Sequence, residues 1–502
     1  MKLLGPVYPI LFAVYFPLAL YARNASEVAL PDLTLPIACI IALTISIQIG
    51  LRVLSCNVSK YHIVISACWL VFFFYSPVYD FAQFKHRYLL ASVLAAIAGL
   101  AWLVRRMSNE NIDAATRVLF LMAIILVANP LRVVIVNLWG DVLASDVSKQ
   151  PTGNQLIWRV TQPGSTPPDI YYVILDGYAG QATLQKNFEF DNHAFLSLLQ
   201  QNGFYIASES RSNYPMTLSS IPSAMNMEYL HKMGARLGRP LKPTELKELI
   251  FNGRVATTLK AHGYQFLYVD SGPHLHPTNK EMVDLYLQYD RMSYYTATLL
   301  SFTILRDWID NIGGLMTRYT VDGRAWVPDS IMWALQQIRQ VSQRANPKFV
   351  FAHILSPHSP YYHDKSCNIV PAYQHQRWND FDGEFEDYKA AYIGQLQCIN
   401  REVEVLVQYL LTTGNRNAII ILQADHGPPE IMDRSILRHA PDTDLNLFRY
   451  NILNAYYVPE EIRSKLYPSI SPVNTFRLIF NAIFQETNTL LPDQILEFRK
   501  FE

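Results

Sequence analysis

The chain has 502 residues, and its 42 Lys and Arg are balanced by 42 Asp and Glu, so its formal net charge is zero. A chain of this length is too long for one small domain and suits two or three folding units. A nucleic-acid binder needs a basic face, and a disordered chain is poor in hydrophobic residues, which make up 50% of this sequence. Composition therefore excludes both classes, and we expect no nucleic-acid partner.

Five apolar segments occupy the first 140 residues. They lie at about 6–22, 33–51, 61–79, 88–104 and 118–139. Each is close to the ~20 residues that cross the core of a bilayer. The first follows Lys2, as a signal peptide would, but no convincing small-residue cleavage site comes after it. We therefore predict a transmembrane domain of five helices over residues 1–140.

The charges between these segments predict the orientation of the chain, because Lys and Arg near span ends stay on the cytoplasmic side. With the N-terminus inside, the inner side carries Lys2, Arg52, Lys60, Arg105, Arg106 and Arg117. The outer loops carry only Arg23, Lys85 and Arg87. This asymmetry favours a cytoplasmic N-terminus, and an odd number of spans then puts everything after residue 140 outside.

The rest of the chain reads as a linker followed by a second domain. Residues 141–168 are polar and contain Gly and Pro, whereas residues 169–502 alternate short apolar runs with helical patterns. Strands are predicted at 170–175, 264–269, 348–354, 417–424 and 451–458, and helices near 192–202, 329–344 and 386–412. This alternation is typical of an α/β domain with a central, mainly parallel sheet covered on both faces.

The five cysteines are too few and too scattered for a disulfide scaffold, and none has zinc-finger spacing. Only Cys367 and Cys398 lie in the polar half of the chain. They could pair in an oxidising compartment, and the sequence leaves that question open.

Polar side chains end or follow three of the predicted strands. The residues are Asp176, His353 with His358, and Asp425 with His426. Open α/β sheets bind ligands at the carboxyl ends of their strands, so we expect these side chains to meet. Carboxylate and imidazole groups are ligands for zinc or manganese. A capped turn would explain each residue alone, but together they favour a metal site.

A hydroxyl-rich segment, SNYPMTLSSIPSAMNMEYL at 212–230, offers a nucleophile. Pro215 is well placed to open a helix, which would put Thr217 in the first turn, where backbone N–H groups and the helix dipole favour an anion. A nearby metal ion would lower the pKa of the hydroxyl. Ser219 or Ser220 could replace Thr217, and an ordinary helix cap would explain the same residues.

Together these residues resemble the alkaline phosphatase and sulfatase superfamily, in particular its membrane-embedded lipoteichoic acid synthases and phosphoethanolamine transferases. That branch has five N-terminal spans and an extracytoplasmic α/β domain. Its Thr-x-x-Ser-x-Pro segment resembles TLSSIP at 217–222, and its Asp-His-Gly signature resembles 425–427. Its first acidic ligand, usually Glu, is matched by Asp176, and its two His five residues apart are matched by His353 and His358.

The resemblance implies a role for each of these residues. Asp176, Thr217, Asp425 and His426 would hold a divalent zinc or manganese ion, and Thr217 would attack phosphorus. A second ion or the substrate phosphate would be bound by His358, together with His353 and with His439, which lies 13 residues after His426.

Two departures from the superfamily narrow the expected chemistry. No cysteine begins a Cys-x-Pro-x-Arg motif, so the formylglycine nucleophile of classical sulfatases has no precursor. Ser223 stands where phosphoethanolamine enzymes carry a disulfide cysteine, so the donor could carry phosphoethanolamine or phosphoglycerol.

The resemblance therefore implies a phosphotransferase in the bacterial cytoplasmic membrane with a periplasmic catalytic domain. It would move a phospho-alcohol group from a phospholipid to an envelope glycan or lipid through a phospho-threonine intermediate. The alternatives are a phosphate- or sulfate-ester hydrolase and an inert membrane scaffold. The oligomeric state is left open.

Overall fold

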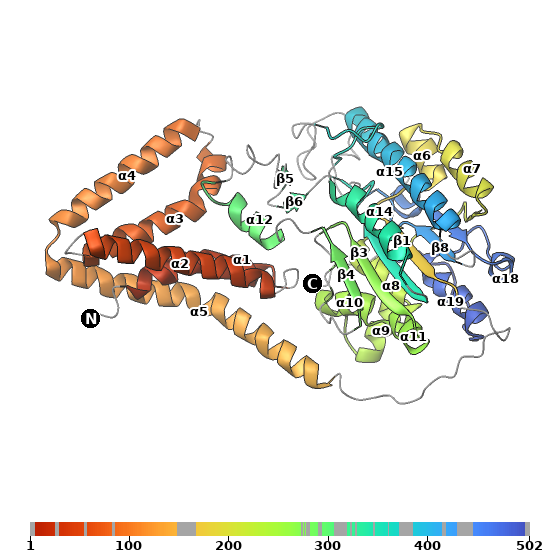
Figure 1. Cartoon of the computed structure of the whole chain (residues 1–502), viewed down its shortest axis with the longest axis horizontal. Coiled ribbons are helices and arrows are strands. Elements are labelled where there is room, and N and C mark those ends of the chain that lie inside the picture. Colours follow the sequence, from red (N-terminus) through yellow and green to blue (C-terminus); the bar gives the residue numbers. More distant parts are fainter. Residues whose placement is uncertain are drawn as a thin grey trace. The chain divides into compact units, whose positions relative to one another are not determined.

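The structure is a computed structural model with two compact units, which are described separately (Figure 1). One unit comprises Met1–Thr152 and Asp290–Trp326, and the other comprises Gly153–Tyr289 and Val327–Glu502. The residues described are 6–25, 30–54, 58–82, 86–147, 167–272, 275, 277, 282–289, 294–305, 319–321, 324–326, 329–344, 347–359, 361–370, 385–413, 418–428 and 445–496.

All five predicted apolar segments form helices in the first unit. They are α1 (Val7–Arg23), α2 (Leu30–Leu54), α3 (Val58–Ala82), α4 (His86–Arg106) and α5 (Asn109–Val147). Within the described residues, four stretches are long and apolar enough to cross a membrane: Asp32–Leu54, Ser59–Tyr79, Arg87–Arg106 and Asn109–Val136. Helix α1 has 17 residues and falls in a shorter class of apolar helix. The chain is thus a membrane protein with four such helices among its described residues, and a fifth span stays a prediction.

A short helix from the second half of the sequence also belongs to the first unit. This is α12 (Tyr294–Ser301), whose Tyr295 hydroxyl donates a 2.7 Å hydrogen bond to the carbonyl of Pro17 in α1. Just beyond it, the Phe302 carbonyl accepts a 3.2 Å bond from the N–H of Ser76 in α3. Helix α12 therefore packs with the N-terminal helices, although the sequence assigned residues 290–326 to the α/β domain. The hairpin of β5 (Tyr319–Val321) and β6 (Arg324–Trp326) falls in the same unit.

The second unit is built on a seven-stranded sheet in the order β2-β9-β8-β1-β7-β3-β4. Its strands are β1 (Ile170–Leu175), β2 (Tyr205–Ile206), β3 (Gln265–Asp270), β4 (Leu285–Gln288), β7 (Lys348–Ile354), β8 (Ile419–Gln423) and β9 (Asn454–Tyr457). The five strands β8, β1, β7, β3 and β4 run parallel, and β9 is antiparallel to β8. The predicted mainly parallel α/β sheet is confirmed.

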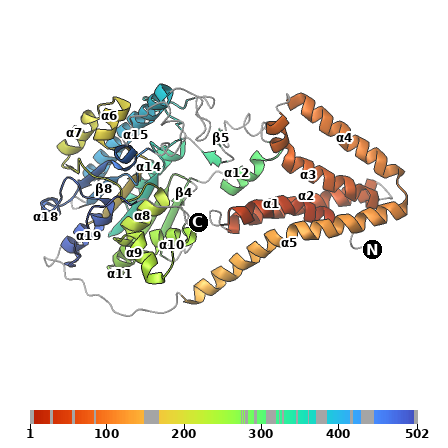
Figure 2. The same cartoon turned by 180° about the vertical axis from the view of Figure 1, so that it is seen from behind.

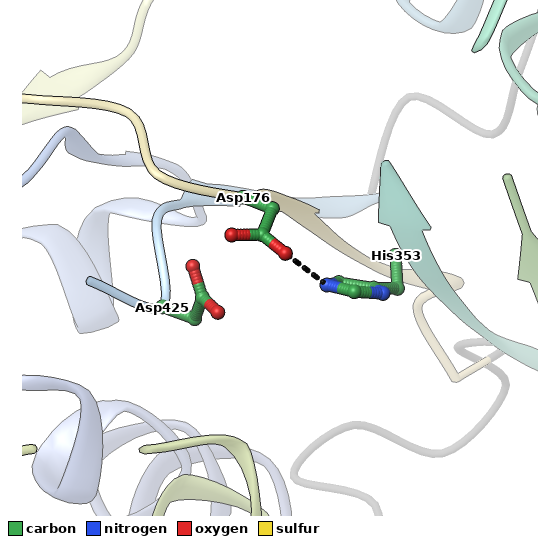
Figure 3. Close-up of side chains that lie close together, drawn as sticks. All are labelled: Asp176, His353 and Asp425. Carbon is green, nitrogen blue, oxygen red and sulfur yellow. Dashed lines mark hydrogen bonds and ion pairs between the residues drawn. The ribbon is translucent and has the colours of Figure 1, made fainter. Parts of the chain in front are cut away.

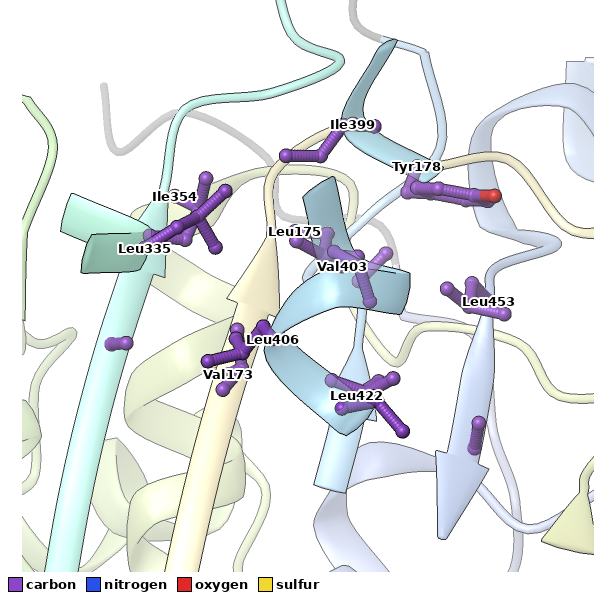
Figure 4. Packing of buried hydrophobic residues seen from close by; sticks show 14 of the residues in the cluster. Val173, Leu175, Tyr178, Leu335, Ile354, Ile399, Val403, Leu406, Leu422 and Leu453 are labelled. Atoms are coloured by element: carbon purple, nitrogen blue, oxygen red, sulfur yellow. The ribbon is translucent and has the colours of Figure 1, made fainter. Parts of the chain in front are cut away.

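Helices cover both faces of this sheet (Figure 2). One face packs on α6 (Gln181–Phe188), α7 (His193–Gln201), α14 (Asp329–Ser342) and α15 (Phe385–Thr413). The other packs on α8 (Thr217–Asn226), α10 (Pro243–Phe251), α11 (Arg254–Ala261) and α19 (Pro472–Ile483). Figure 4 shows the first face, where Val173 and Leu175 of β1 meet Val403 and Leu406 of α15. Tyr172 and Ile174, which alternate with them along β1, pack into the core on the other face.

Three short helices complete the described elements of this unit: α9 (Leu230–Leu237), α17 (Leu445–Tyr450) and α18 (Glu460–Arg463).

Two further bonds hold the second unit together. The Lys348 ammonium lies 2.7 Å from the Asp169 carboxylate in a buried ion pair at the start of β7 and β1. Cys367 and Cys398, the pair that the sequence left open, form a disulfide between the segment after β7 and helix α15, with 5.0 Å between their Cα atoms.

Candidate functional site

Acidic and imidazole side chains converge at the carboxyl edge of the sheet, as the strand ends predict. Asp176 follows β1, His353 lies at the end of β7, and Asp425 follows β8 (Figure 3). One ligand atom from each of the three lies within 4.8 Å of the others, and all three side chains are buried. Because β1 lies between β7 and β8 in the parallel sheet, their ends deliver these groups to one place.

His426 brings the nucleophile candidate into the same cluster. Its Nε2 atom lies 3.5 Å from Oδ1 of Asp176 and 3.4 Å from Oδ2 of Asp425. The Thr217 hydroxyl lies 3.3 Å from the same Nε2 atom. Ligands at 2.0–2.1 Å from a tetrahedral zinc ion are separated from one another by about 3.3 Å. The separations in this cluster match that spacing.

The carboxylates each have one oxygen fixed by the protein and one turned toward His426. Oδ1 of Asp425 accepts bonds from the N–H groups of His426 (2.9 Å) and Gly177 (3.2 Å). Oδ2 of Asp176 lies 3.2 Å from Nε2 of His353. Among the described residues, neither Oδ1 of Asp176 nor Oδ2 of Asp425 has a hydrogen-bond partner, although both atoms are buried. Buried carboxylate oxygens are costly without a partner, so the pair fits a bound cation.

The tautomer of His426 is determined by its neighbour. Its Nδ1 atom lies 2.7 Å from the carbonyl of Gly427, which can only accept, so Nδ1 carries the hydrogen and Nε2 presents its lone pair to the cluster. Burial lowers the pKa of His426, and the charge of Arg449 lowers it further. The ring is therefore neutral at pH 7, the form in which imidazole binds metals.

Asp176 stays ionised despite its burial. Burial raises its pKa, but the charge of His358 and the hydrogen bond from His353 outweigh burial, and the net pKa lies below its ordinary value. The carboxylate is thus in the form that a cation requires.

Thr217 is the hydroxyl that faces this cluster. It is the first residue of α8, after Met216 in extended conformation, so the helix begins two residues later than Pro215. The hydroxyl of Ser219 donates to the carbonyl of Met216, and that of Ser220 donates to the carbonyl of Asp425. Both serine hydroxyls are therefore hydrogen-bonded to backbone carbonyls, whereas the Thr217 hydroxyl contacts the His426 ring.

Of the three remaining predicted residues, His353 lies in the cluster and His358 lies beside it. His358 is half-buried, and its ring centroid is 6.2 Å from that of His426. Its backbone N–H donates a 3.0 Å hydrogen bond to the carbonyl of Asp176. Nε2 of His353 is hydrogen-bonded to Oδ2 of Asp176. His439 lies outside the described residues.

Comparison with protein families decides the class of this domain. The sulfatase family profile matches residues 168–457, which is more than half of the chain. The chain belongs to the sulfatase family. The predicted alkaline phosphatase and sulfatase resemblance is therefore confirmed. Both cysteines of this sulfatase-family domain, Cys367 and Cys398, are joined in a disulfide, so neither offers a free thiol as a nucleophile.

The solved structures similar to part of this chain include one named as a transferase and one named as a hydrolase. The C-terminal periplasmic domain of EcEptC from Escherichia coli in complex with zinc is 12% identical, with a TM-score of 0.41 over 64% of this chain and 83% of that chain. The phosphonate monoester hydrolase of Agrobacterium radiobacter is 13% identical, with a TM-score of 0.43 over 63% and 74%. The soluble domain of lipooligosaccharide phosphoethanolamine transferase A from Neisseria meningitidis is 11% identical, with a TM-score of 0.38 over 63% and 88%. Similarities of this size carry no activity from those proteins to this one, and no curated protein sequence matches the chain.

Two residues near the sulfatase-family site were missed by the sequence analysis. Asp270 is the last residue of β3, and its Oδ1 lies 4.0 Å from Nδ1 of His353. Burial raises the pKa of Asp270 to about 7. The rule that identified Asp176 could have found it, because it directly follows the predicted strand at 264–269. Arg449 in α17 had no such signal, since it contacts the site through backbone carbonyls.

Proposed function

We propose that the protein is a metal-dependent phosphotransferase that moves a phospho-alcohol group, phosphoethanolamine or phosphoglycerol, from a membrane phospholipid to an envelope glycan or lipid. One observation carries the proposal: the Thr217 hydroxyl lies 3.3 Å from the ring nitrogen of His426 that also faces Asp176 and Asp425. A hydroxyl in that position is a nucleophile candidate among groups suited to bind a cation.

Asp176, Thr217, Asp425 and His426 would hold one divalent ion, zinc or manganese. When bound, the ion would lower the pKa of the Thr217 hydroxyl and neutralise charge on the phosphoryl oxygens. His358 would bind the substrate phosphate or a second ion, with His439 as a further candidate. The first turn of α8 adds backbone N–H groups and the positive end of the helix dipole beside Thr217.

The reaction would proceed in two displacements at phosphorus. In the first, the Thr217 oxygen forms a bond to phosphorus while the bond from phosphorus to the diacylglycerol oxygen breaks, and the proton lost by Thr217 ends on diacylglycerol. In the second, an acceptor hydroxyl forms the new bond, the threonine–phosphorus bond breaks, and the acceptor's proton returns to Thr217. Neither step needs an oxidant or a reductant.

The membrane helices favour a lipid donor over a soluble ester. One apolar helix would suffice as an anchor, whereas the part of the chain that the structure describes has four helices long enough to cross a bilayer. We propose that α1 is the fifth span, because its 17 residues lie at the lower limit for a span. With the N-terminus in the cytoplasm, the catalytic unit would lie outside the bacterial cytoplasmic membrane.

The sulfatase family match also favours a second candidate, a phosphate- or sulfate-ester hydrolase in which water replaces the acceptor. An inert scaffold is disfavoured, because it has no need for a half-buried hydroxyl beside a set of buried ligand atoms.

A donor panel separates these functions. Purified full-length protein, loaded with manganese or zinc, is incubated with phospholipids labelled in the head group, and lipid products are followed by mass spectrometry. Diacylglycerol formation that depends on Thr217 identifies the donor, and the Ser219→Ala variant is the matched control because its hydroxyl donates to backbone. Label released only as the free phospho-alcohol would make the protein a hydrolase.

A further inference from the structure

Arg449 is a buried cation that binds two segments of the site through their backbone. It lies in α17, and its side chain is almost fully covered. One terminal nitrogen donates to the carbonyls of Gly427 (3.1 Å) and Pro428 (2.9 Å). The other donates to the carbonyl of Pro215.

These carbonyls belong to the two segments that carry the reacting groups. Pro215 lies two residues before Thr217, and Gly427 directly follows His426. The Gly427 carbonyl is the one that accepts from Nδ1 of His426 and so points Nε2 at Thr217. Arg449 therefore touches the group that determines the tautomer of His426 and the chain that leads into the nucleophile.

The backbone around Arg449 reinforces this arrangement. The N–H of Gly427 donates a 2.7 Å bond to the carbonyl of Arg449, so the two residues are bonded in both directions. A Cβ atom on Gly427 would lie 2.3 Å from the carbonyl of Phe448, a distance at which no side chain fits. The loop after His426 is thus held tightly against α17.

We propose that Arg449 is a positioning residue that sets the separation between Thr217 and His426. The physical reason is that a planar guanidinium can hold several carbonyls at fixed angles, which a lysine ammonium on a flexible stem cannot do. Loss of the guanidinium frees the Pro215 and Gly427 carbonyls, so the Thr217 hydroxyl and Nε2 of His426 no longer share one fixed geometry. The role of that geometry in catalysis rests on the proposed function. The hydrogen bonds by which Arg449 fixes the two segments, its bracing of the site, do not depend on it.

Arg477 provides a matched control. It lies in α19, and its guanidinium donates to the carbonyls of Met227 (2.7 Å) and Thr489 (2.5 Å). Met227 directly follows the last residue of α8 and caps it, at the opposite end of the helix from Thr217. Arg477→Ala therefore also removes bonds to backbone carbonyls, one of them at α8, but away from the site.

Hydrogen exchange of the full-length protein in detergent tests the bracing without reference to activity. Arg449→Ala should raise deuterium uptake in peptides covering 213–220 and 425–428 and leave 227–230 unchanged, and Arg477→Ala should do the reverse. Added guanidinium should restore protection at 213–220 and 425–428 in Arg449→Ala. Unchanged uptake at 213–220 and 425–428 would overturn the proposal. If Arg449→Ala does not fold, Arg449→Lys is compared in the same way.

Calorimetric titration with Mn²⁺ or Zn²⁺ alone then tests the consequence for the site. Residues that orient metal ligands typically contribute 10–100-fold to affinity, so we expect a Kd about 10–100-fold weaker in Arg449→Ala. Arg477→Ala should leave the Kd unchanged. Equal affinity in wild type and Arg449→Ala would contradict positioning. A wild type that binds neither ion would refute the proposed function, while the exchange result would still decide the role of Arg449.

Discussion

Thr217 and His426 are separated by 209 residues in sequence, yet the Thr217 hydroxyl lies 3.3 Å from Nε2 of His426. Two independent links join their segments, because the Ser220 hydroxyl donates to the carbonyl of Asp425 and Arg449 bonds the carbonyls of Pro215 and Gly427. Helix α8, which carries Thr217, and the loop after β8, which carries His426, are therefore held to each other by hydrogen bonds.

Removing a ligand should remove the metal. We expect Asp425→Ala and His426→Ala to lose the bound ion and all activity, because each leaves the cluster with too few donors. Asp191→Ala is the matched control, since Asp191 and His193 form a 2.6 Å pair on the surface. Elemental analysis of purified protein gives the metal content, and wild-type content in both site variants would refute the site.

The buried ion pair at the other end of the strands should matter for stability and not for metal. Lys348→Met leaves the Asp169 carboxylate buried without its ammonium partner, and breaking such a pair costs about 3–5 kcal/mol. The unfolding temperature should fall while the metal content stays constant. The double variant Asp169→Asn, Lys348→Met should recover much of the loss, and a double variant as unstable as the single would show that the charge is not the cause.

The fold of the second unit was largely predictable from sequence because its central strands are buried on both faces. Strands β1 and β7 have the predicted bounds, since β1 is a continuous apolar run and β7 contains one at 349–352. Strand β2 has two half-buried residues and β4 four, and neither offers such a run. The site residues Asp176 and Asp425 were found because they follow recognisable strands.

Other features depend on contacts that no local pattern carries. Arg449 acts on backbone carbonyls, and any residue can supply a carbonyl. Residues 290–326 belong to the first unit because Tyr295 and Leu299 are buried among its helices, although α12 has only eight residues. From the sequence alone, so short a helix is assigned to the α/β domain, because the segments before and after it belong to that domain.

The position of α12 predicts how a truncated protein will behave. A fragment of residues 153–502 keeps α12 but lacks the helices that cover Tyr295 and Leu299. We expect this fragment to aggregate or to require detergent, because its apolar side chains become exposed. Replacing residues 290–326 by a flexible linker should give a soluble monomer in gel filtration. An unmodified fragment that is already monomeric without detergent would show that α12 needs no cover.

The charge asymmetry around the apolar segments predicts the topology. In a variant without Cys39, Cys56 and Cys68, a single cysteine placed at Gln150 should react with a membrane-impermeant reagent in intact cells. A cysteine at Asn109 should react only after the cells are lysed. The reverse pattern would place the catalytic unit in the cytoplasm and contradict the proposed topology.

Mass analysis of Thr217 tests covalent phosphotransfer most directly. Protein purified from its host and digested should contain a peptide from 212–230 that carries a phospho-alcohol on Thr217, and Thr217→Ala should lose both the adduct and diacylglycerol production. Ser219→Ala and Ser220→Ala should keep the adduct, because their hydroxyls donate to backbone carbonyls in the native protein. Wild-type rates of diacylglycerol formation in Thr217→Ala would contradict the phospho-threonine mechanism.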